Sequence, residues 1–259
     1  MVKIKVLEKA TDKFAIDSDK KIYKLKILIS DVSPQFLNVI KRTIEEEVKC
    51  LAIEDVYIIE NNSAMWDEMI AHRLGLIPLN TPENLSYNSK VKLYLEKKGK
   101  GYVLASDIKS ENPQVYPVYP DTIIAYLGEN HSLKIEMYAV FGNGNEHAKW
   151  IPANVYYYRL VDLKLKGELT KEEIEKLKKL GVEIKNGNLE IPKDKKYDRT
   201  FLDAIYSVSR YKIEEIPKEE YVFVIESFGQ YSAEKIINLA INEIREKLKE
   251  LMNFFMINE

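Results

Sequence analysis

The chain opens with two runs in which apolar and polar side chains alternate, which is the pattern of β-strands with one buried face. The alternating apolar positions are Val2, Ile4 and Val6 in the first run and Tyr23, Leu25, Ile27 and Ile29 in the second. A polar turn at residues 17–21 separates the two runs. We therefore expect a hairpin or a meander at the start of the fold.

A helix is predicted to follow, over residues 33–48. Ser33 can cap its first turn, and Pro34 suits the first helical position because its missing N–H would have no partner there. The apolar side chains fall on one face of this helix and are Phe36, Leu37, Ile40, Ile44 and Val48. That apolar face needs a partner surface.

After Cys50 the pattern changes to short strands and loops. Strands are predicted over residues 51–61, 133–141 and 154–166, a short helix over 65–76, and a hairpin over 90–108. The hairpin is expected to turn around Gly99 and Gly101. The proline-rich stretch 110–121 predicts an extended loop.

Residues 166–211 are strongly charged and predict a small inserted module. Thr170 and Glu173 have the spacing of a capping box, which opens a helix that Gly181 is expected to end. A hairpin with an Asn-Gly turn at residues 186–187 follows, and then a second helix over 199–211.

The last helix carries the most regular apolar pattern in the chain. A strand over residues 221–230 precedes it, Ser232 is its predicted cap, and it runs almost to Glu259. Its apolar residues are spaced alternately by four and three positions and are Ile237, Ile241, Ile244, Leu248, Leu251 and Phe255. This spacing is typical of a helix that packs along another helix. At ~1.5 Å per residue the helix extends ~40 Å, so part of this stripe is expected to reach beyond the domain's own core.

Composition narrows the functional classes. The chain has 259 residues, of which 46% are hydrophobic, enough for one or two domains. Its 39 basic and 41 acidic residues give a net charge of -2, and a dedicated DNA-binding protein would usually be more basic. No run approaches the ~18 apolar residues of a membrane helix and the N-terminus has no signal-peptide core, so we expect a cytoplasmic protein without membrane contact.

The stretch FGNGNEHAKW, residues 141–150, raises the possibility of a nucleotide-binding turn. A dinucleotide fingerprint needs a third glycine and a following helix. His147 occupies the position of that third glycine, and Pro152 prevents helix continuation. We therefore interpret the stretch as a hairpin connection in which Gly142 and Gly144 supply positive φ angles.

The stretch WDEMIAHR is a second candidate for chemistry, with Asp67, Glu68, His72 and Arg73. On a helix, Glu68 and His72 share a face and could form a metal site or an acid–base pair. The second histidine of a zinc-binding H-E-x-x-H motif is missing, however, so a helix surface or a salt bridge is the favoured interpretation. No serine, cysteine or lysine nucleophile has an identifiable base beside it, and we expect no catalytic residue in this chain.

Four segments in order carry a resemblance to a known family. They are NVIKRTIEEEV (38–48), residues 60–79, residues 103–160 and residues 222–248. Together they resemble the D-type subunit of archaeal RNA polymerase, a family related to the N-terminal domain of the bacterial alpha subunit and to the third-largest subunit of eukaryotic RNA polymerase II. The strongest markers are DEMIAHRLGLIPL (67–79) and GNGNEHAKWIP (142–152). Their residues of interest are Asp67, Glu68, His72, Arg73, Gly142, Gly144, His147, Lys149 and Trp150.

The resemblance implies an α+β fold with a discontinuous dimerisation domain, residues 1–49 and 218–259, built from an antiparallel sheet and two helices. A mainly β insert domain, residues 50–217, interrupts it and includes a small ferredoxin-like module at 166–211.

It also implies a non-catalytic assembly and scaffold subunit of DNA-directed RNA polymerase, a nucleotidyltransferase complex. The expected partners are the small subunit L in a heterodimer, the large catalytic subunits and the small zinc-bearing subunits, with no direct DNA binding. The predicted interface with subunit L consists of Phe36, Ile40, Ile44, Ile237, Ile241, Ile244, Leu248, Leu251 and Phe255.

One departure from the family concerns cofactors. Many relatives carry cysteines for an iron–sulfur cluster in the ferredoxin-like module, whereas the only cysteine here is Cys50. We therefore predict that no cluster is bound. Two alternatives to the scaffold role stay open at this point: an enzyme that uses residues 67–73, and a stand-alone nucleic-acid binder.

Overall fold

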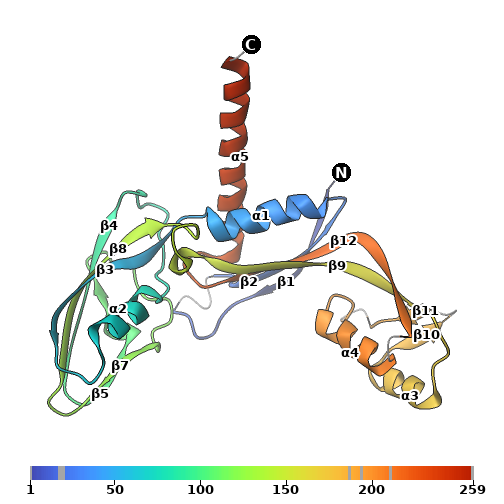
Figure 1. Cartoon of the computed structure of the whole chain (residues 1–259), viewed down its shortest axis with the longest axis horizontal. Helices are drawn as coiled ribbons and strands as arrows, with labels where there is room; N and C mark the ends of the chain where they lie inside the picture. The colour runs from blue at the N-terminus through green and yellow to red at the C-terminus, as the bar shows by residue number, and fades with distance from the viewer. Residues whose placement is uncertain (1, 17–20, 186–187, 193–194, 210–211, 258–259) are drawn as a thin grey trace. The chain divides into compact units, whose positions relative to one another are not determined.

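The protein has an α+β fold with five α-helices and mostly antiparallel sheets in the described part of the chain (Figure 1). The computed structural model describes residues 2–16, 21–185, 188–192, 195–209 and 212–257. Its helices are α1 (Pro34–Glu46), α2 (Asp67–Gly75), α3 (Lys171–Lys179), α4 (Arg199–Ser209) and α5 (Ala233–Ile257), with single 3-10 turns η1 (Ala105–Asp107) and η2 (Ala148–Trp150).

The strands form three sheets. They are β1 (Lys3–Ala10), β2 (Lys24–Ser30), β3 (Cys50–Asn61), β4 (Lys90–Lys98), β5 (Gly101–Leu104), β6 (Lys109–Ser110), β7 (Ile123–Leu127), β8 (Ser132–Gly142), β9 (Ala153–Leu165), β10 (Glu183–Lys185), β11 (Asn188–Glu190) and β12 (Ile213–Ser227). The first sheet has the order β1-β2-β12-β9-β11-β10, the second β3-β8-β4-β6, and the third pairs β5 with β7.

The chain packs as two compact units. Unit 1 contains residues 27–32 and 157–223 with the first five residues, and unit 2 contains residues 6–26, 33–156 and 224–259. This division follows packing. The functional division into residues 1–49 with 218–259, and 50–217, stays a prediction.

Each unit has its own apolar core. In unit 2, α2 and strands β3, β4 and β8 bury a cluster that includes Ile53, Ile70, Leu74, Leu93 and Met137. In unit 1, helices α3 and α4 pack on the sheet through a smaller cluster that includes Leu163, Leu177, Val182, Leu202 and Ile205.

Local signals in the sequence are confirmed at the helix ends. The Ser33 Oγ accepts a hydrogen bond of 3.3 Å from the Phe36 N–H, and Pro34 occupies the first turn of α1. Thr170 and Glu173 form the predicted capping box, because the Glu173 N–H donates to Thr170 Oγ1 at 3.3 Å and the Thr170 N–H donates to the Glu173 carboxylate at 2.8 Å. Gly181 follows α3 with a φ of 84°, which is the left-handed conformation that ends many helices.

The predicted hairpin over residues 90–108 is wrong. Both strands exist, but β4 pairs with β8 and β6, whereas β5 pairs with β7 in a different sheet. Gly99 and Gly101 have φ angles of 82° and 151° and carry the chain from one sheet to the other.

Two predicted turns lie mostly or wholly outside the described residues. Residues 17–20 of the first turn and residues 186–187 of the Asn-Gly turn are not described. The strands around the second turn are confirmed, since Lys185 pairs with Asn188 and Glu183 with Glu190 in an antiparallel ladder.

Candidate functional site

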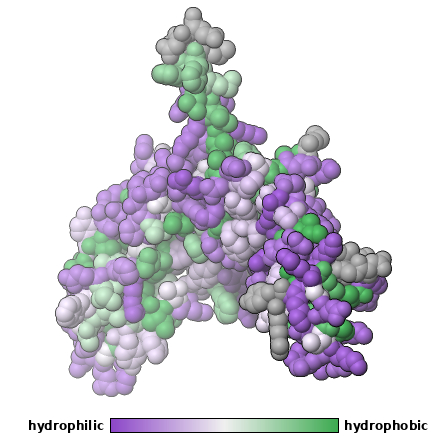
Figure 2. All heavy atoms as spheres, turned by 45° about the vertical axis from the view of Figure 1, so that its right-hand side comes forward, coloured by the Kyte–Doolittle hydropathy of each residue, from purple (hydrophilic) through white to green (hydrophobic). Residues whose placement is uncertain are grey.

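The free end of α5 carries a group of exposed apolar side chains. Ala233, Ile236 and Ala240 near the start of the helix are buried, but every side chain from residue 245 to residue 255 is exposed. The exposed fractions reach 54% for Leu248, 55% for Leu251 and 66% for Phe255. Figure 1 shows α5 extending past α1, and Figure 2 shows hydrophobic residues along the visible side of this free end.

The predicted stripe on α5 therefore has two parts. Ile237, Ile241 and Ile244 are half-buried, whereas Leu248, Leu251 and Phe255 lie on the exposed end. The pattern alone did not identify Met252 and Phe254, which are 62% and 63% exposed. Both lie off the alternating four-and-three register, so only the excess of apolar residues over residues 248–257 could have indicated them.

Helix α1 packs beside α5 and adds a smaller apolar surface. Phe36 is 49% exposed and Ile40 is half-buried. Ile44 is fully buried in the chain's own core, which corrects its assignment to the partner surface. Val39, which the prediction omitted, is 47% exposed.

An ion pair joins the two helices. The Lys247 ammonium lies 2.7 Å from the carboxylate of Glu47, the residue that caps α1. Both side chains are partly exposed, so the pair adds little stability by itself. Beyond Lys247 every side chain of α5 that the structure describes is exposed.

The glycines of the GNG motif have a different role from the one predicted. Neither Gly142 nor Gly144 has a positive φ, and the segment between β8 and β9 joins two different sheets, so it is not a hairpin. A β-carbon on Gly142 would lie 2.4 Å from the Trp150 ring, and one on Gly144 would lie 1.8 Å from the Glu45 carbonyl oxygen. Both positions require glycine because neighbouring groups approach the backbone too closely for a side chain.

Hydrogen bonds hold this loop in a fixed shape. The Asn143 Oδ1 accepts from the N–H groups of Asn145 and Glu146 at 3.1 and 3.3 Å. The Asn145 N–H also donates to the Glu46 carbonyl at 3.3 Å, which ties the loop to the end of α1. Only the single turn η2 follows, so the loop lacks the helix N-terminus that a dinucleotide site needs.

Lys149 and Trp150 anchor the far side of the loop. The Lys149 ammonium donates to the Ile53 carbonyl at 3.1 Å and pairs with the Glu54 carboxylate. It also lies 4.4 Å from the centre of the Trp150 ring, within cation–π range. The Trp150 indole is buried and donates to the Val140 carbonyl at 3.2 Å. Lys149 is thus fully engaged within the chain.

The residues of the 67–73 motif do not assemble an acid–base pair. The Asp67 carboxylate accepts from the Asn61 side-chain amide at 2.6 Å, and the Arg73 guanidinium donates to the Ile124 carbonyl at 3.0 Å. The side chains of Glu68 and His72 are exposed, and neither forms a hydrogen bond or an ion pair with any other residue that the structure describes. Glu68 and His72 therefore do not form the acid–base pair that the enzyme interpretation requires.

Residues of the two family motifs, 67–79 and 142–152, line one pocket. His72, Gly75 and Leu76 from α2 and its end line the same pocket as His147 and Lys149. The pocket has a volume of about 340 Å³, and β3 supplies its remaining wall.

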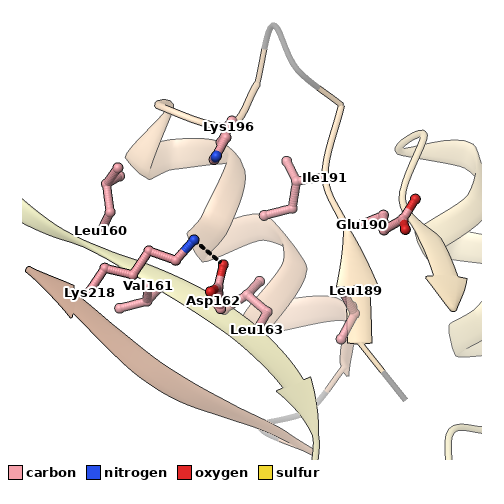
Figure 3. Close-up of a pocket in the computed structure, with 9 residues that line it drawn as sticks. All are labelled: Leu160, Val161, Asp162, Leu163, Leu189, Glu190, Ile191, Lys196 and Lys218. Atoms are coloured by element: carbon pink, nitrogen blue, oxygen red, sulfur yellow. Dashed lines mark ion pairs between the residues drawn. The ribbon is translucent and has the colours of Figure 1, made fainter. Parts of the chain in front are cut away.

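A second pocket, of about 330 Å³, lies in unit 1 (Figure 3). Its walls are Leu160, Val161, Leu163, Leu189 and Ile191, with Asp162, Glu190, Lys196 and Lys218 as its polar residues. Lys218 on β12 and Asp162 on β9 point toward each other and pair at 2.6 Å, so their charges cancel. The described residues that line this pocket include no imidazole, thiol or hydroxyl, so they offer no set of groups for nucleophilic catalysis.

Metal-binding and membrane features were sought among the described residues as well. No group of three or more His, Cys, Asp or Glu residues in that part of the chain is placed to hold a metal ion. No described helix is both long enough and apolar enough to cross a membrane.

Comparison with known proteins identifies the family. Residues 56–157 match the model of the RNA polymerase Rpb3/RpoA insert domain. The chain is 33% identical to DNA-directed RNA polymerase subunit Rpo3 of Thermococcus kodakarensis, with 98% of this chain and 97% of the relative covered. It is also 33% identical to subunit Rpo3 of Pyrococcus horikoshii over the same shares, and 31% identical to that of Pyrobaculum calidifontis over 91% and 93%. This similarity spans nearly the whole of each chain, so the protein belongs to the family of archaeal DNA-directed RNA polymerase subunit Rpo3.

Proposed function

We propose that this chain is the D-type subunit of an archaeal DNA-directed RNA polymerase, a non-catalytic assembly and scaffold subunit that pairs with the small subunit L. The observation that carries the proposal is the free end of α5, where every described side chain from residue 245 onward is exposed. A helix with apolar residues on all its turns is stable in water only when another surface covers it.

The exposed apolar side chains of α5 can supply part of the binding free energy that a stable pair needs. Five large apolar side chains are more than half exposed on this end of α5, namely Leu248, Leu251, Met252, Phe254 and Phe255. Each contributes ~1.5 to 3 kcal/mol when fully buried. Because association costs an estimated ~4 to 15 kcal/mol, further contacts are needed. Phe36, Val39 and Ile40 on α1 are the exposed or half-buried residues that can supply them.

The proposal assigns different roles to two parts of the chain. Residues 1–49 and 218–259 form the dimerisation domain, and residues 50–217 form the insert domain that docks the large subunits and the small zinc-bearing subunits. The match to the insert-domain model over residues 56–157 supports the second half of this assignment. Within the insert, residues 166–211 form a ferredoxin-like module that packs through apolar contacts and binds no iron–sulfur cluster.

Catalysis belongs to other chains of the enzyme in this proposal. Phosphodiester formation needs acidic ligands that position magnesium ions. This chain positions the other subunits and contributes no catalytic residue. It binds no DNA directly and works in the cytoplasm. The side chains of Glu68 and His72 are exposed and form no hydrogen bond or ion pair with another described residue, which supports a role without catalysis.

Co-expression with subunit L followed by size-exclusion chromatography with light scattering tests the proposal. The wild-type chain is expected to elute as a one-to-one complex. The double variant Leu248→Asp/Leu251→Asp places two charges in the interface and should elute alone. Asn242→Asp/Asn253→Asp is the matched control, because it adds the same charge to exposed positions on the opposite side of α5. A complex that survives the leucine substitutions would refute the assigned interface.

A further inference from the structure

The pocket of unit 1 has the size of a small-molecule site (Figure 3). Residues of strands β9, β11 and β12 and of the segment after β11 enclose its space of about 330 Å³. Ligand pockets in proteins usually have volumes of ~300 to 1,000 Å³. All of the lining residues belong to unit 1, so one compact unit forms the whole pocket.

Aliphatic side chains form the wall of this pocket. Leu160, Leu163 and Leu189 are buried, and Val161 and Ile191 are half-buried. Their side chains end in methyl groups, which form no hydrogen bonds with water. Covering such a wall with an apolar group removes it from water and is favourable. The wall therefore suits a ligand with an aliphatic body.

Three of the four charged side chains at this pocket are already paired. The Lys218 ammonium pairs with the Asp162 carboxylate at 2.6 Å. The Glu190 carboxylate pairs with the Lys185 ammonium at 2.7 Å, and in Figure 3 it points away from the two lysines of the pocket. The fourth charged side chain of the lining is Lys196.

Lys196 is the cation that stays available to a ligand. Its side chain is exposed and forms no hydrogen bond or ion pair with any residue that the structure describes. Its ammonium lies 5.8 Å from the centre of the Tyr197 ring, which is close to the outer limit of a cation–π contact. Because a lysine side chain is long and flexible, this ammonium can reach a group that enters the pocket.

We propose that this pocket binds a small aliphatic carboxylate. The hydrocarbon body covers the apolar wall, and the carboxylate accepts hydrogen bonds from the Lys196 ammonium. The inference goes beyond the scaffold role and does not depend on it, because every group that it uses belongs to unit 1 of this chain.

The remaining lining selects against other anions. The Asp162 carboxylate lies on the same lining, so a second negative charge on the ligand would be repelled. The lining has no glycine loop that could present successive N–H groups to a phosphate. It also has no aromatic ring on which a nucleobase could stack. A singly charged aliphatic acid is therefore favoured over phosphates and nucleotides.

A methyl NMR titration of the full chain with octanoate tests the site. Octanamide is the matched ligand, because it has the same chain length and no charge. We expect octanoate to shift the methyl signals of Leu160, Val161, Leu163, Leu189 and Ile191 in a saturable manner. Octanoate should bind at least ~5-fold more tightly than octanamide, since a charge-assisted hydrogen bond is stronger than a neutral one.

Two lysine variants test the role of the charge. Lys196→Met keeps a long side chain but removes the ammonium, so it should lower the octanoate affinity by ~5-fold or more and leave the octanamide affinity unchanged. Lys195→Met is the matched control, because Lys195 is exposed and does not line the pocket. Added salt should weaken octanoate binding to the wild type and leave octanamide binding unchanged.

Three results would overturn the proposal. One is the absence of saturable shifts at the pocket methyls up to about 10 mM octanoate, a concentration well above a millimolar Kd. Another is equal affinity for octanoate and octanamide, or equal loss in the Lys196→Met and Lys195→Met chains. The third is a set of shifts confined to exposed methyls of α5 such as those of Leu248 and Leu251, which would mean nonspecific apolar association. The methyl spectrum of each variant also reports whether unit 1 is folded.

Discussion

The backbone of Gly144 lies directly against the carbonyl oxygen of Glu45 at the end of α1. A β-carbon at residue 144 would be 1.8 Å from that oxygen and 3.1 Å from Ile151 Cγ1. The loop of the second family motif is therefore seated on the helix that the proposal assigns to the partner interface. The Asn145 N–H bond to the Glu46 carbonyl supports the same contact.

Gly144→Ala should destabilise unit 2, because the added methyl group meets backbone atoms that cannot rotate away. The expected cost is ~1 to 3 kcal/mol of unfolding free energy. Asn145→Ala is the control and should change this free energy by less than ~0.5 kcal/mol, since its side chain is exposed. Guanidinium unfolding followed by tryptophan fluorescence measures both, because Trp66 and Trp150 lie in unit 2. Equal stability of the two variants would contradict the close approach.

Cys50 should not react with thiol reagents in the native protein. It is fully buried, its Sγ–H donates to the Trp150 carbonyl at 3.0 Å, and burial raises the pKa of the thiol to about 12. The thiolate is the reactive form, so both access and ionisation are suppressed. Labelling with a chromogenic disulfide at about pH 8 should be negligible in buffer and reach one thiol per chain in guanidinium. Fast labelling of folded protein would disprove the packing around β3.

Acid should weaken the α3–α4 module through Glu173. The Thr170 N–H and the Lys212 ammonium lower the pKa of this carboxyl to about 2. A carboxyl with a depressed folded-state pKa contributes stability that is complete above its ordinary value of ~4.3 and lost as the pH falls toward 2. Glu173→Gln should therefore reduce stability near neutral pH and flatten its decline in acid.

Amide exchange of Leu177 and Ile205, both buried in the core of unit 1, measures this effect. Glu172→Gln is the control, since the Glu172 side chain is 73% exposed and its ion pair with Lys176 lies at the surface. A Glu173→Gln protein with the same acid profile as the wild type would show that the capping carboxylate has no such role.

Signals confined to a few neighbouring residues were predicted well from the sequence. The caps at Ser33 and Thr170 and the stop at Gly181 depend on side chains that bond to backbone within the next turn and on a backbone angle that glycine adopts easily. The strands β3, β8 and β9 were also expected, because their apolar patterns need no knowledge of the partner strand.

Features set by distant parts of the chain were predicted poorly. Strands β4 and β5 are adjacent in sequence, yet β4 pairs with β8 and β6 whereas β5 pairs with β7 in another sheet. The helical stripe on α1 was identified, but periodicity cannot tell that Ile44 faces its own core while Phe36 faces outward. Residues 142 and 144 must be glycine because Trp150 and Glu45 lie too close for a side chain. The sequence does not show these tertiary contacts, so it suggests positive φ angles as the reason instead.

The segment 166–211, which we propose to be a ferredoxin-like module, should contain no iron–sulfur cluster. Residues 166–211, which lie in unit 1, hold no cysteine. The single cysteine, Cys50, is buried in unit 2. Thiolates are the usual ligands of such clusters. Protein purified without oxygen should therefore contain far less than stoichiometric iron and acid-labile sulfide. Stoichiometric amounts of both would mean that other ligands hold a cluster.

We propose above all that another polypeptide covers the free end of α5. Hydrogen–deuterium exchange of residues 246–257 tests this most directly. In the chain alone these amides should exchange rapidly, because no described side chain from residue 245 onward is buried. In the complex with subunit L, the same amides should exchange at least ~10-fold more slowly. Exchange that is already slow in the isolated chain, or that does not change when L is added, would contradict the account.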